Sequence, residues 1–178
     1  VTRCTNSFIE NADYLKKLAI PEQVFVAQDA GSSFLSLTIG MALLVCISSV
    51  LGHYPMWSWL TLPVILILLQ GFGFGLGLIL GLLNTFFRDI SQALSLFLQL
   101  WFWATPIVYT ENILPSWLKN RLFWNPVYPF INALHTVIVQ RAWPCPHAWA
   151  SMLCMAFGLP LLGYVILKKL RPEIRDVL

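Results

Sequence analysis

The fold is decided by residues 31–87, which read GSSFLSLTIGMALLVCISSVLGHYPMWSWLTLPVILILLQGFGFGLGLILGLLNTFF and contain no Asp, Glu, Lys or Arg. One transmembrane helix needs about 20 predominantly apolar residues, so this stretch is long enough for two. The sequence GHYP at residues 52–55 divides it, because Gly and Pro favour turns and interrupt helices. We therefore predict two transmembrane spans, at residues 33–51 and 58–83.

Two further apolar runs extend this pattern towards the C-terminus. Arg88 and Asp89 interrupt the first stretch, and the charge-free run that follows them predicts a third span at residues 91–109. A last charge-free run predicts a fourth span at residues 148–167. The chain is therefore predicted to be an all-α membrane protein with a single transmembrane domain over residues 1–178.

The composition also favours a membrane protein. The 178 residues are 58% hydrophobic and 11% charged, with a mean hydropathy of +0.72, whereas soluble domains are about 25% charged. A soluble fold of this size could not bury so much apolar surface, which argues against a soluble enzyme, a nucleic-acid-binding protein and a disordered tail. The four cysteines have neither metal-ligand spacing nor the pattern of a disulfide framework. Because the chain begins with Val1 rather than Met, we expect more protein to precede it.

The segment between the third and fourth spans differs from the spans. Residues 111–141 contain charges and several prolines, so no clean apolar run of spanning length remains. We predict two short helices there, at residues 115–124 and 129–140. Helices of this length lie at the membrane interface or enter the membrane and return on the same side.

The basic residues predict the orientation, because Lys and Arg are enriched in cytoplasmic loops. Four spans place both ends of the chain and the loop after the second span on the same side of the membrane. That side carries eight of the 11 basic residues, namely Arg3, Lys16, Lys17, Arg88, Lys168, Lys169, Arg171 and Arg175. The other side carries Lys119, Arg121 and Arg141. Both ends are therefore predicted to be cytoplasmic, and the two short helices extracytoplasmic.

The glycines of the second predicted span have two interpretations. Their spacing includes G-x-G-x-x-x-G, which superficially resembles a dinucleotide-binding loop, but the motif lies inside an apolar span and follows no soluble strand. Small residues four positions apart allow two helices to approach closely in lipid. We therefore interpret Gly73, Gly77 and Gly81 as a helix-packing face.

Aromatic residues gather towards the predicted outer side. An interfacial aromatic belt is one explanation, and contact with the apolar faces of sugars is the other. The candidates for a substrate channel or gate are Trp101, Trp103, Tyr109, Trp117, Trp124 and Tyr128. No acidic residue lies deep in a predicted span, which argues against a proton-coupled carrier. His135, in the second short helix, is a candidate functional residue without a defined partner.

Residues 11–20 have the pattern of a short amphipathic helix that ends before Pro21. Its apolar residues are Tyr14, Leu15 and Leu18, and its basic residues are Lys16 and Lys17. Such a helix either lies on the membrane surface or docks into a groove of a cytoplasmic partner.

Several motifs together resemble a known family. They are the N-A-D-Y-L-K-K-L-x-x-P segment, F-F-R-D-I at residues 86–90, W-F-W-A-T-P-I-V-Y at residues 101–109, I-L-P at residues 113–115 and W-N-P-V-Y-P at residues 124–129. In this order and spacing they resemble the membrane subunit of type-2 ABC exporters that transport polysaccharides such as O-antigen, capsule or teichoic acid. The resemblance covers nearly the whole chain.

The resemblance implies a specific architecture. The four spans of this chain would be the last four of a six-helix permease, with two short re-entrant outer helices as an extracytoplasmic gate. Residues 11–20 would be the cytoplasmic coupling helix, and Arg88 and Asp89 would lie in a cytoplasmic loop. Two permease subunits would pair in the bacterial inner membrane and bind two separate ATPase subunits. A lipid-linked glycan would pass between the two permeases.

The resemblance also implies that this chain holds no cofactor and that the partner ATPase binds ATP and Mg²⁺. In agreement, the sequence contains no P-loop G-x-x-x-x-G-K-[ST] motif. Three alternatives remain at this stage. One is a structural subunit with no transport role, and another is export of a small molecule or drug by a related permease. The third is a membrane-embedded glycosyl- or acyltransferase, although Asp89 and His53 lie on opposite predicted sides and form no catalytic constellation.

Overall fold

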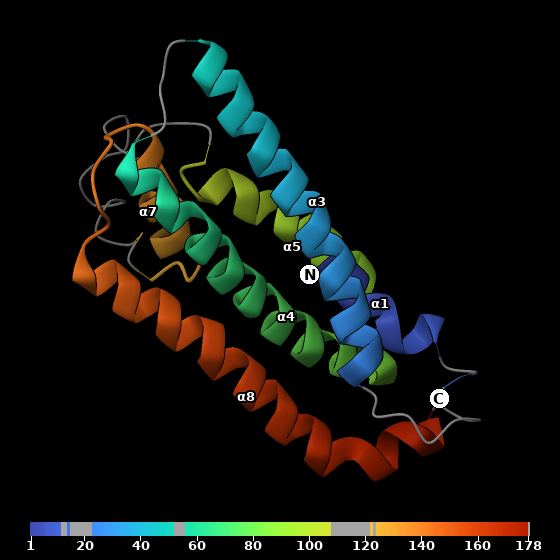
Figure 1. The fold of residues 1–178 in the computed structure, drawn as a ribbon. Coiled ribbons are helices and arrows are strands. Elements are labelled where there is room, and N and C mark those ends of the chain that lie inside the picture. Colours follow the sequence, from blue (N-terminus) through green and yellow to red (C-terminus); the bar gives the residue numbers. More distant parts are fainter. Residues whose placement is uncertain (12–13, 15–22, 52–55, 108–121, 123, 178) are drawn as a thin grey trace.

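A computed structural model describes residues 1–11, 14, 23–51, 56–107, 122 and 124–177. Over these residues the chain forms six α-helices and one 3-10 helix, without a strand. In chain order they are α1 (Thr2–Glu10), α3 (Gln23–Val50), the 3-10 helix η1 (Trp57–Thr61), α4 (Leu62–Phe86), α5 (Ile90–Ala104), α7 (Tyr128–Ile138) and α8 (Pro146–Val177), arranged as shown in Figure 1. The predicted all-α fold class is confirmed for this part of the chain.

Three of the four predicted spans correspond to helices long and apolar enough to cross a membrane. These candidate spans are Gln23–Val50, Trp57–Phe86 and Pro146–Leu170. The helices extend beyond the predicted spans at residues 33–51 and 148–167, because charge marks where the hydrocarbon region ends and not where a helix must end. Thus α3 begins before Asp29, and α8 continues past Lys168 and Lys169.

Helix α5 covers only part of the third predicted span, at residues 91–109. Helix α5 ends at Ala104, and Thr105 has an extended backbone, with φ −99° and ψ 134°. A helix of 15 residues is about 22 Å long, less than the ~30 Å of a hydrocarbon core. Pro106 explains the early end, because the residue before a proline is pushed out of the helical region. The count of four spanning helices is therefore not confirmed.

Helix α4 is the centre of the fold and packs against α8 along most of its length (Figure 1). A row of glycines on one face of α4 makes this possible. A Cβ atom on Gly75 would overlap the backbone of Leu159 and the ring of Pro160, and one on Gly71 would lie 3.0 Å from the carbonyl oxygen of Ala156. Without side chains at these two positions, α8 lies directly on the backbone of α4.

The second glycine row faces a different helix. A Cβ on Gly77 would overlap the side chain of Cys4, and one on Gly81 would lie 3.0 Å from the ring of Phe8. Successive helical residues are rotated by about 100°, so the Gly77 row and the Gly75 row, two residues apart, lie on nearly opposite faces of α4. The predicted close packing through Gly77 and Gly81 is confirmed, with α1 as the partner.

Helix α1 was not expected, because residues 2–10 contain too few apolar side chains to indicate a span. Cys4 and Phe8 are nevertheless buried, one helical turn apart, with Thr5 and Ser7 beside them. They belong to an apolar cluster made by α1, α3, α4 and α8, whose buried members are Cys4, Phe8, Val26, Ala30, Leu78, Leu82 and Leu167. This cluster holds together the end of the bundle at which α4 ends.

Helix α7 covers the opposite end of α4. Its residues Phe130, Ala133 and Val137 are buried against α4, η1 and α8, and the rings of Phe130 and Phe72 are 5.5 Å apart. Tyr128–Ile138 agrees closely with the short helix predicted at residues 129–140. Most of the other predicted short helix, at residues 115–124, and most of the coupling helix at residues 11–20 lie outside the described residues.

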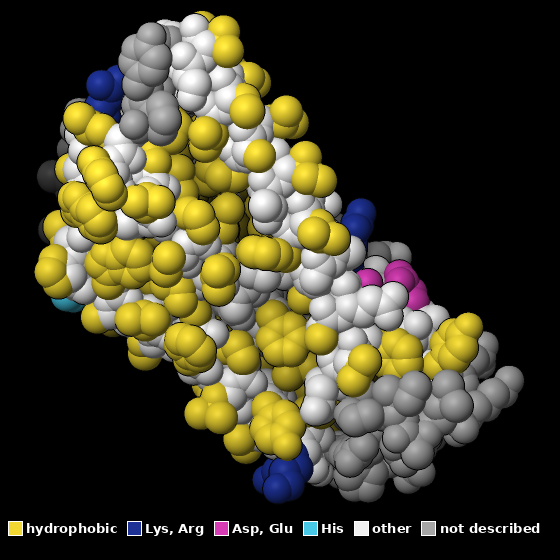
Figure 2. All heavy atoms as spheres, in the orientation of Figure 1, with side chains coloured by type: hydrophobic (Ala, Val, Ile, Leu, Met, Phe, Trp, Pro, Cys, Tyr) yellow, Lys and Arg dark blue, Asp and Glu magenta, His cyan; other side chains and the backbone are white. Residues whose placement is uncertain are grey.

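The surface of the bundle is apolar. In the most apolar 18-residue stretch of α3 no residue is buried, and in the corresponding stretch of α8 only 22% of the residues are buried. Figure 2 shows hydrophobic side chains over most of one face, with the charged side chains at its margin. Such a surface is unsuited to water and suits contact with lipid or with other transmembrane helices.

Candidate functional site

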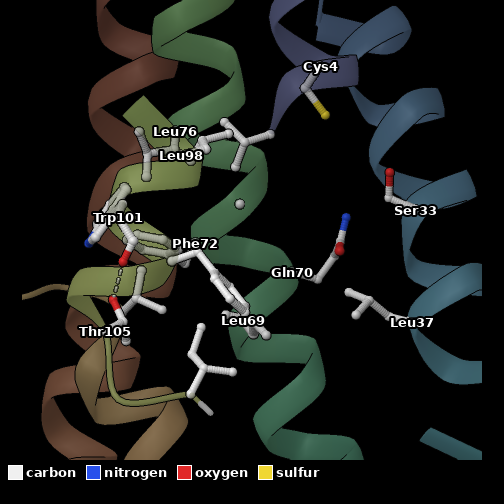
Figure 3. A pocket seen from close by; sticks show the side chains of 15 residues that line it. Cys4, Ser33, Leu37, Leu69, Gln70, Phe72, Leu76, Leu98, Trp101 and Thr105 are labelled. Atoms are coloured by element: carbon white, nitrogen blue, oxygen red, sulfur yellow. Dashed lines mark hydrogen bonds between the residues drawn. The ribbon is translucent and has the colours of Figure 1, made fainter. Parts of the chain in front are cut away.

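A cavity of about 350 Å³ lies between α3, α4 and α5, and α1 reaches its edge (Figure 3). Most of its walls are apolar, with contributions from Leu37, Phe72 and Leu98. Ser33, Gln70 and Thr105 are its principal polar side chains, and Figure 3 shows Gln70 and Ser33 facing each other across the gap between α4 and α3. This lining suits a hydrocarbon chain better than a sugar.

The polar groups in this cavity are satisfied within the protein. Gln70 Nε2 donates a hydrogen bond of 2.7 Å to the carbonyl oxygen of Ala30, and the hydroxyl of Ser33 donates one of 2.9 Å to the carbonyl of Asp29. A polar group in a membrane interior is costly unless it is hydrogen-bonded. The bond from Gln70 therefore fixes α3 to the middle of α4.

A second set of polar contacts connects the end of α5 to the start of α7, and we call it the α5–α7 polar link. The indole Nε1 of Trp101 donates to Asn125 Oδ1 at 2.9 Å, and Asn125 Nδ2 donates to the hydroxyl oxygen of Thr105 at 2.8 Å. That hydroxyl in turn donates to the carbonyl of Trp101 at 2.9 Å, and the backbone N–H of Val127 donates to Asn125 Oδ1 at 3.1 Å. Thr105 is 2% exposed.

The α5–α7 polar link explains two of the sequence motifs in physical terms. The W-F-W-A-T-P motif supplies Trp101 and Thr105, and the W-N-P motif supplies Asn125. Both motifs were recognised in the sequence, but neither Thr105 nor Asn125 was assigned a role from it. The available signal was a polar residue before each proline, Thr105 before Pro106 and Asn125 before Pro126, in otherwise apolar surroundings.

The predicted channel aromatics do not form one wall within this chain. Trp101 is partly buried and lines the cavity, whereas Trp103 is 64% exposed and its ring meets that of Phe102 edge-on, with centroids 5.8 Å apart. Trp124 is 88% exposed and Tyr128 is half-buried at the start of α7. Tyr109 and Trp117 lie outside the described residues. A channel between two subunits involves more than a single chain, so the predicted role of these residues stays a prediction.

The other end of the bundle contains a polar junction of three helices, which we call the Asn84 junction. The Asn84 side chain is fully buried. Its Nδ2 donates to the carbonyl oxygen of Thr5 at 3.2 Å and to Asn6 Oδ1 at 3.3 Å, both on α1. Its Oδ1 accepts the backbone N–H of Ser91, in the first turn of α5, at 3.1 Å.

The predicted loop residues lie near this junction. Arg88 and Asp89 form the exposed turn between α4 and α5, and Arg88 is four residues after Asn84 in the chain. Tyr14 is 59% exposed, and its ring is 6.5 Å from that of Phe25 in the first turn of α3. The other predicted coupling residues, Leu15, Lys16, Lys17 and Leu18, lie outside the described residues. His135 is half-buried in the last turn of α7.

The apolar helices and the polar links between them define a multi-span membrane protein. The sequence model of the ABC-2 type transporter family matches residues 15–139. The chain therefore belongs to the ABC-2 type transporter family, which confirms the family predicted from the motifs.

Individual relatives agree with this assignment. The chain is similar to two proteins of Klebsiella pneumoniae named O-antigen export system permease protein RfbA, with 29% and 32% identity over 174 residues. It is also 29% identical over 169 residues to a Myxococcus xanthus protein of the same name. These alignments include 94–97% of this chain but only 65–66% of each relative. The chain thus spans just under two thirds of the length of these relatives.

Proposed function

We propose that the chain is the permease subunit of an ATP-driven exporter that moves lipid-linked polysaccharide across the bacterial inner membrane. The observation that carries this proposal is the ABC-2 family match over residues 15–139, which include α3, α4, α5 and α7. The relatives named as O-antigen export permeases support a polysaccharide as the substrate. The apolar cavity beside Gln70 is compatible with the hydrocarbon part of a lipid-linked glycan.

The proposed subunit contains four crossings, the last four of a six-helix permease. Helix α5 would provide the third crossing although it is short. It starts at the turn after α4, and its far end is joined by the Trp101–Asn125 bond to the segment that leads into α7. Because α7 packs on the opposite end of α4, α5 returns along the length of α4. The residues after Ala104 would complete the crossing, and α7 would be one of two re-entrant gate helices.

The proposed transporter contains two copies of this chain and a cytoplasmic ATP-binding subunit, which would bind ATP and Mg²⁺. This chain would take part in transport but would not itself hydrolyse ATP. The coupling residues would be Tyr14, Leu15, Lys16, Lys17 and Leu18. Trp101, Trp103, Tyr109, Trp117, Trp124 and Tyr128 would line the channel or its gate between the two copies.

An export assay tests this proposed function. In a strain without the gene, lipid-linked polysaccharide should accumulate on the cytoplasmic side and disappear from the cell surface, and the wild-type gene should restore export. Loss of the ATP-binding subunit should give the same phenotype. Unchanged surface polysaccharide would exclude glycan export and leave a small molecule as the substrate. Loss of surface polysaccharide without internal accumulation would instead indicate a biosynthetic enzyme.

The proposed orientation places both ends of the chain in the cytoplasm and is testable with a native thiol. Cys145 is exposed beside the start of α8, whereas Lys169 lies near the opposite end of that helix. In a variant with Cys4, Cys46 and Cys154 replaced by Ala, an impermeant maleimide should label Cys145 in intact cells. With Cys145→Ala and Lys169→Cys in addition, labelling should require permeabilised cells. The reverse pattern would contradict the orientation.

A further inference from the structure

The Asn84 junction is the feature of the structure that the proposed function leaves without a role. We propose that Asn84 is a positioning residue that transmits movement of the ATPase-coupling segment to α5 and so links ATP hydrolysis to export. This inference rests on the proposed function. It concerns a residue that touches neither ATP nor glycan and acts through the helices to which it is hydrogen-bonded.

The geometry of Asn84 suits this role because its two polar ends bond different helices. Its amide nitrogen donates to Thr5 and Asn6 in the middle of α1, and its amide oxygen accepts the N–H of Ser91 at the start of α5. The first N–H groups of a helix have no partner within that helix, so the bond to Ser91 also fixes where α5 begins. A displacement of α1 therefore cannot leave both sets of bonds unchanged.

The described residues of the coupling segment, Asn11 and Tyr14, contact both α1 and α3. On one side, Asn11 follows α1, its side-chain nitrogen donates to the carbonyl of Ser7 at 2.9 Å, and Asn11 accepts the N–H of Tyr14 at 3.1 Å. On the other side, Tyr14 contacts Phe25 of α3, which packs against the apolar cluster that includes Phe8. Movement of the segment would thus displace α1 and the start of α3.

Helix α1 also contains an unsatisfied polar group. The hydroxyl oxygen of Ser7 is fully buried and has no hydrogen-bond partner within the described part of the chain. A buried hydroxyl without a partner raises the free energy of that arrangement. A shift of α1 that gave Ser7 a partner would recover this free energy. Helix α1 is therefore suited to a second position, and a shift of α1 would be transmitted to α5 through the hydrogen bonds of Asn84.

The test compares export with ATP hydrolysis in membranes that contain the complete transporter. Asn84→Leu keeps a similar side-chain volume and removes all three hydrogen bonds. We expect the glycan exported per ATP hydrolysed to fall at least about fivefold, the lower range of ordinary coupling between sites, while ATP hydrolysis and co-purification of the ATP-binding subunit persist. A residue with only a structural role would lower both activities together through loss of protein.

Thr85→Val is the matched control. Thr85 is the buried neighbour of Asn84, and its hydroxyl donates only within α4, to the carbonyl of Gly81. This variant should keep the wild-type ratio of export to hydrolysis. If Asn84→Leu does not accumulate in the membrane, Asn6→Ala provides the test, because it removes one acceptor on α1 and should lower the ratio in the same direction.

Two outcomes overturn the inference. One is an unchanged ratio in Asn84→Leu, or in Asn6→Ala where Asn84→Leu does not accumulate. The other is an equal loss of coupling in Thr85→Val. Both presuppose that the wild-type chain exports glycan. If the wild-type chain does not, the proposed function itself is wrong, so the two failures are distinguishable.

Discussion

Replacing Gly75 by leucine should prevent stable accumulation of the protein, and Gly75→Ala should destabilise it clearly. A Cβ atom at this position overlaps the backbone of Leu159 and the ring of Pro160, neither of which can rotate away. Overpacking of a tight interface costs about 1–3 kcal/mol, and we expect Gly75→Ala at the upper end of that range. For a chain of this size, 3 kcal/mol corresponds to a fall in Tm of about 6–12 °C.

Gly158→Ala is the matched control for this prediction. Gly158 lies on α8, and a Cβ atom there would have no neighbour within 4 Å. Alanine is a better helix former than glycine by about 1 kcal/mol, so the Tm of this variant should not fall. The measurement is thermal unfolding of both variants in the same detergent. An equal fall in Tm in both variants would show that the α4–α8 contact is not as close as the structure places it.

The double variant Tyr14→Ala and Leu15→Ala should abolish polysaccharide export while leaving membrane insertion intact. If this segment docks on the ATP-binding subunit, a few apolar anchors would carry most of the contact energy. Truncating one such anchor costs about 2 kcal/mol, which lowers affinity about thirtyfold. The exposed side chain of Tyr14 is available for such a contact. The measurements are co-purification of the ATP-binding subunit and surface glycan.

Lys16→Gln with Lys17→Gln separates docking from simple membrane binding. If the segment only lies on lipid, the two lysines contribute about 1 kcal/mol each through anionic headgroups, an anchor that the transmembrane spans make redundant. Export should therefore survive this change. Normal export and normal co-purification in the Tyr14 and Leu15 double variant would show that the segment is only a membrane-surface element.

The sequence alone determined the membrane class and three of the spans. Absence of charge over residues 31–87 was sufficient for α3 and α4, because the thickness of the hydrocarbon core sets a minimum length for any helix that crosses it. The same reasoning located α8. The order of the motifs from Asn11 to Pro129 was sufficient for the family, which the match over residues 15–139 confirmed. These features depend on the local composition and order of residues, so they can be read along the chain.

The tertiary structure decided which residues meet. The sequence indicated that Gly73, Gly77 and Gly81 pack closely, but the division of the glycines between α1 and α8 depends on how these two helices are placed around α4. Cys4 and Phe8 are buried only because Gly77 and Gly81 leave room for them, so the short helix α1 has no clear signal of its own.

The polar contacts of the candidate site depend on the same three-dimensional arrangement. Asn84 lies 78 and 79 residues from its partners on α1, and Asn125 lies 24 residues from Trp101. An asparagine in an apolar segment reveals a need for hydrogen bonds, because an unpaired amide is costly in a membrane, but not which helix will satisfy it. That choice is made when α1, α5 and the start of α7 pack around α4, and it places the polar links at the two ends of the bundle.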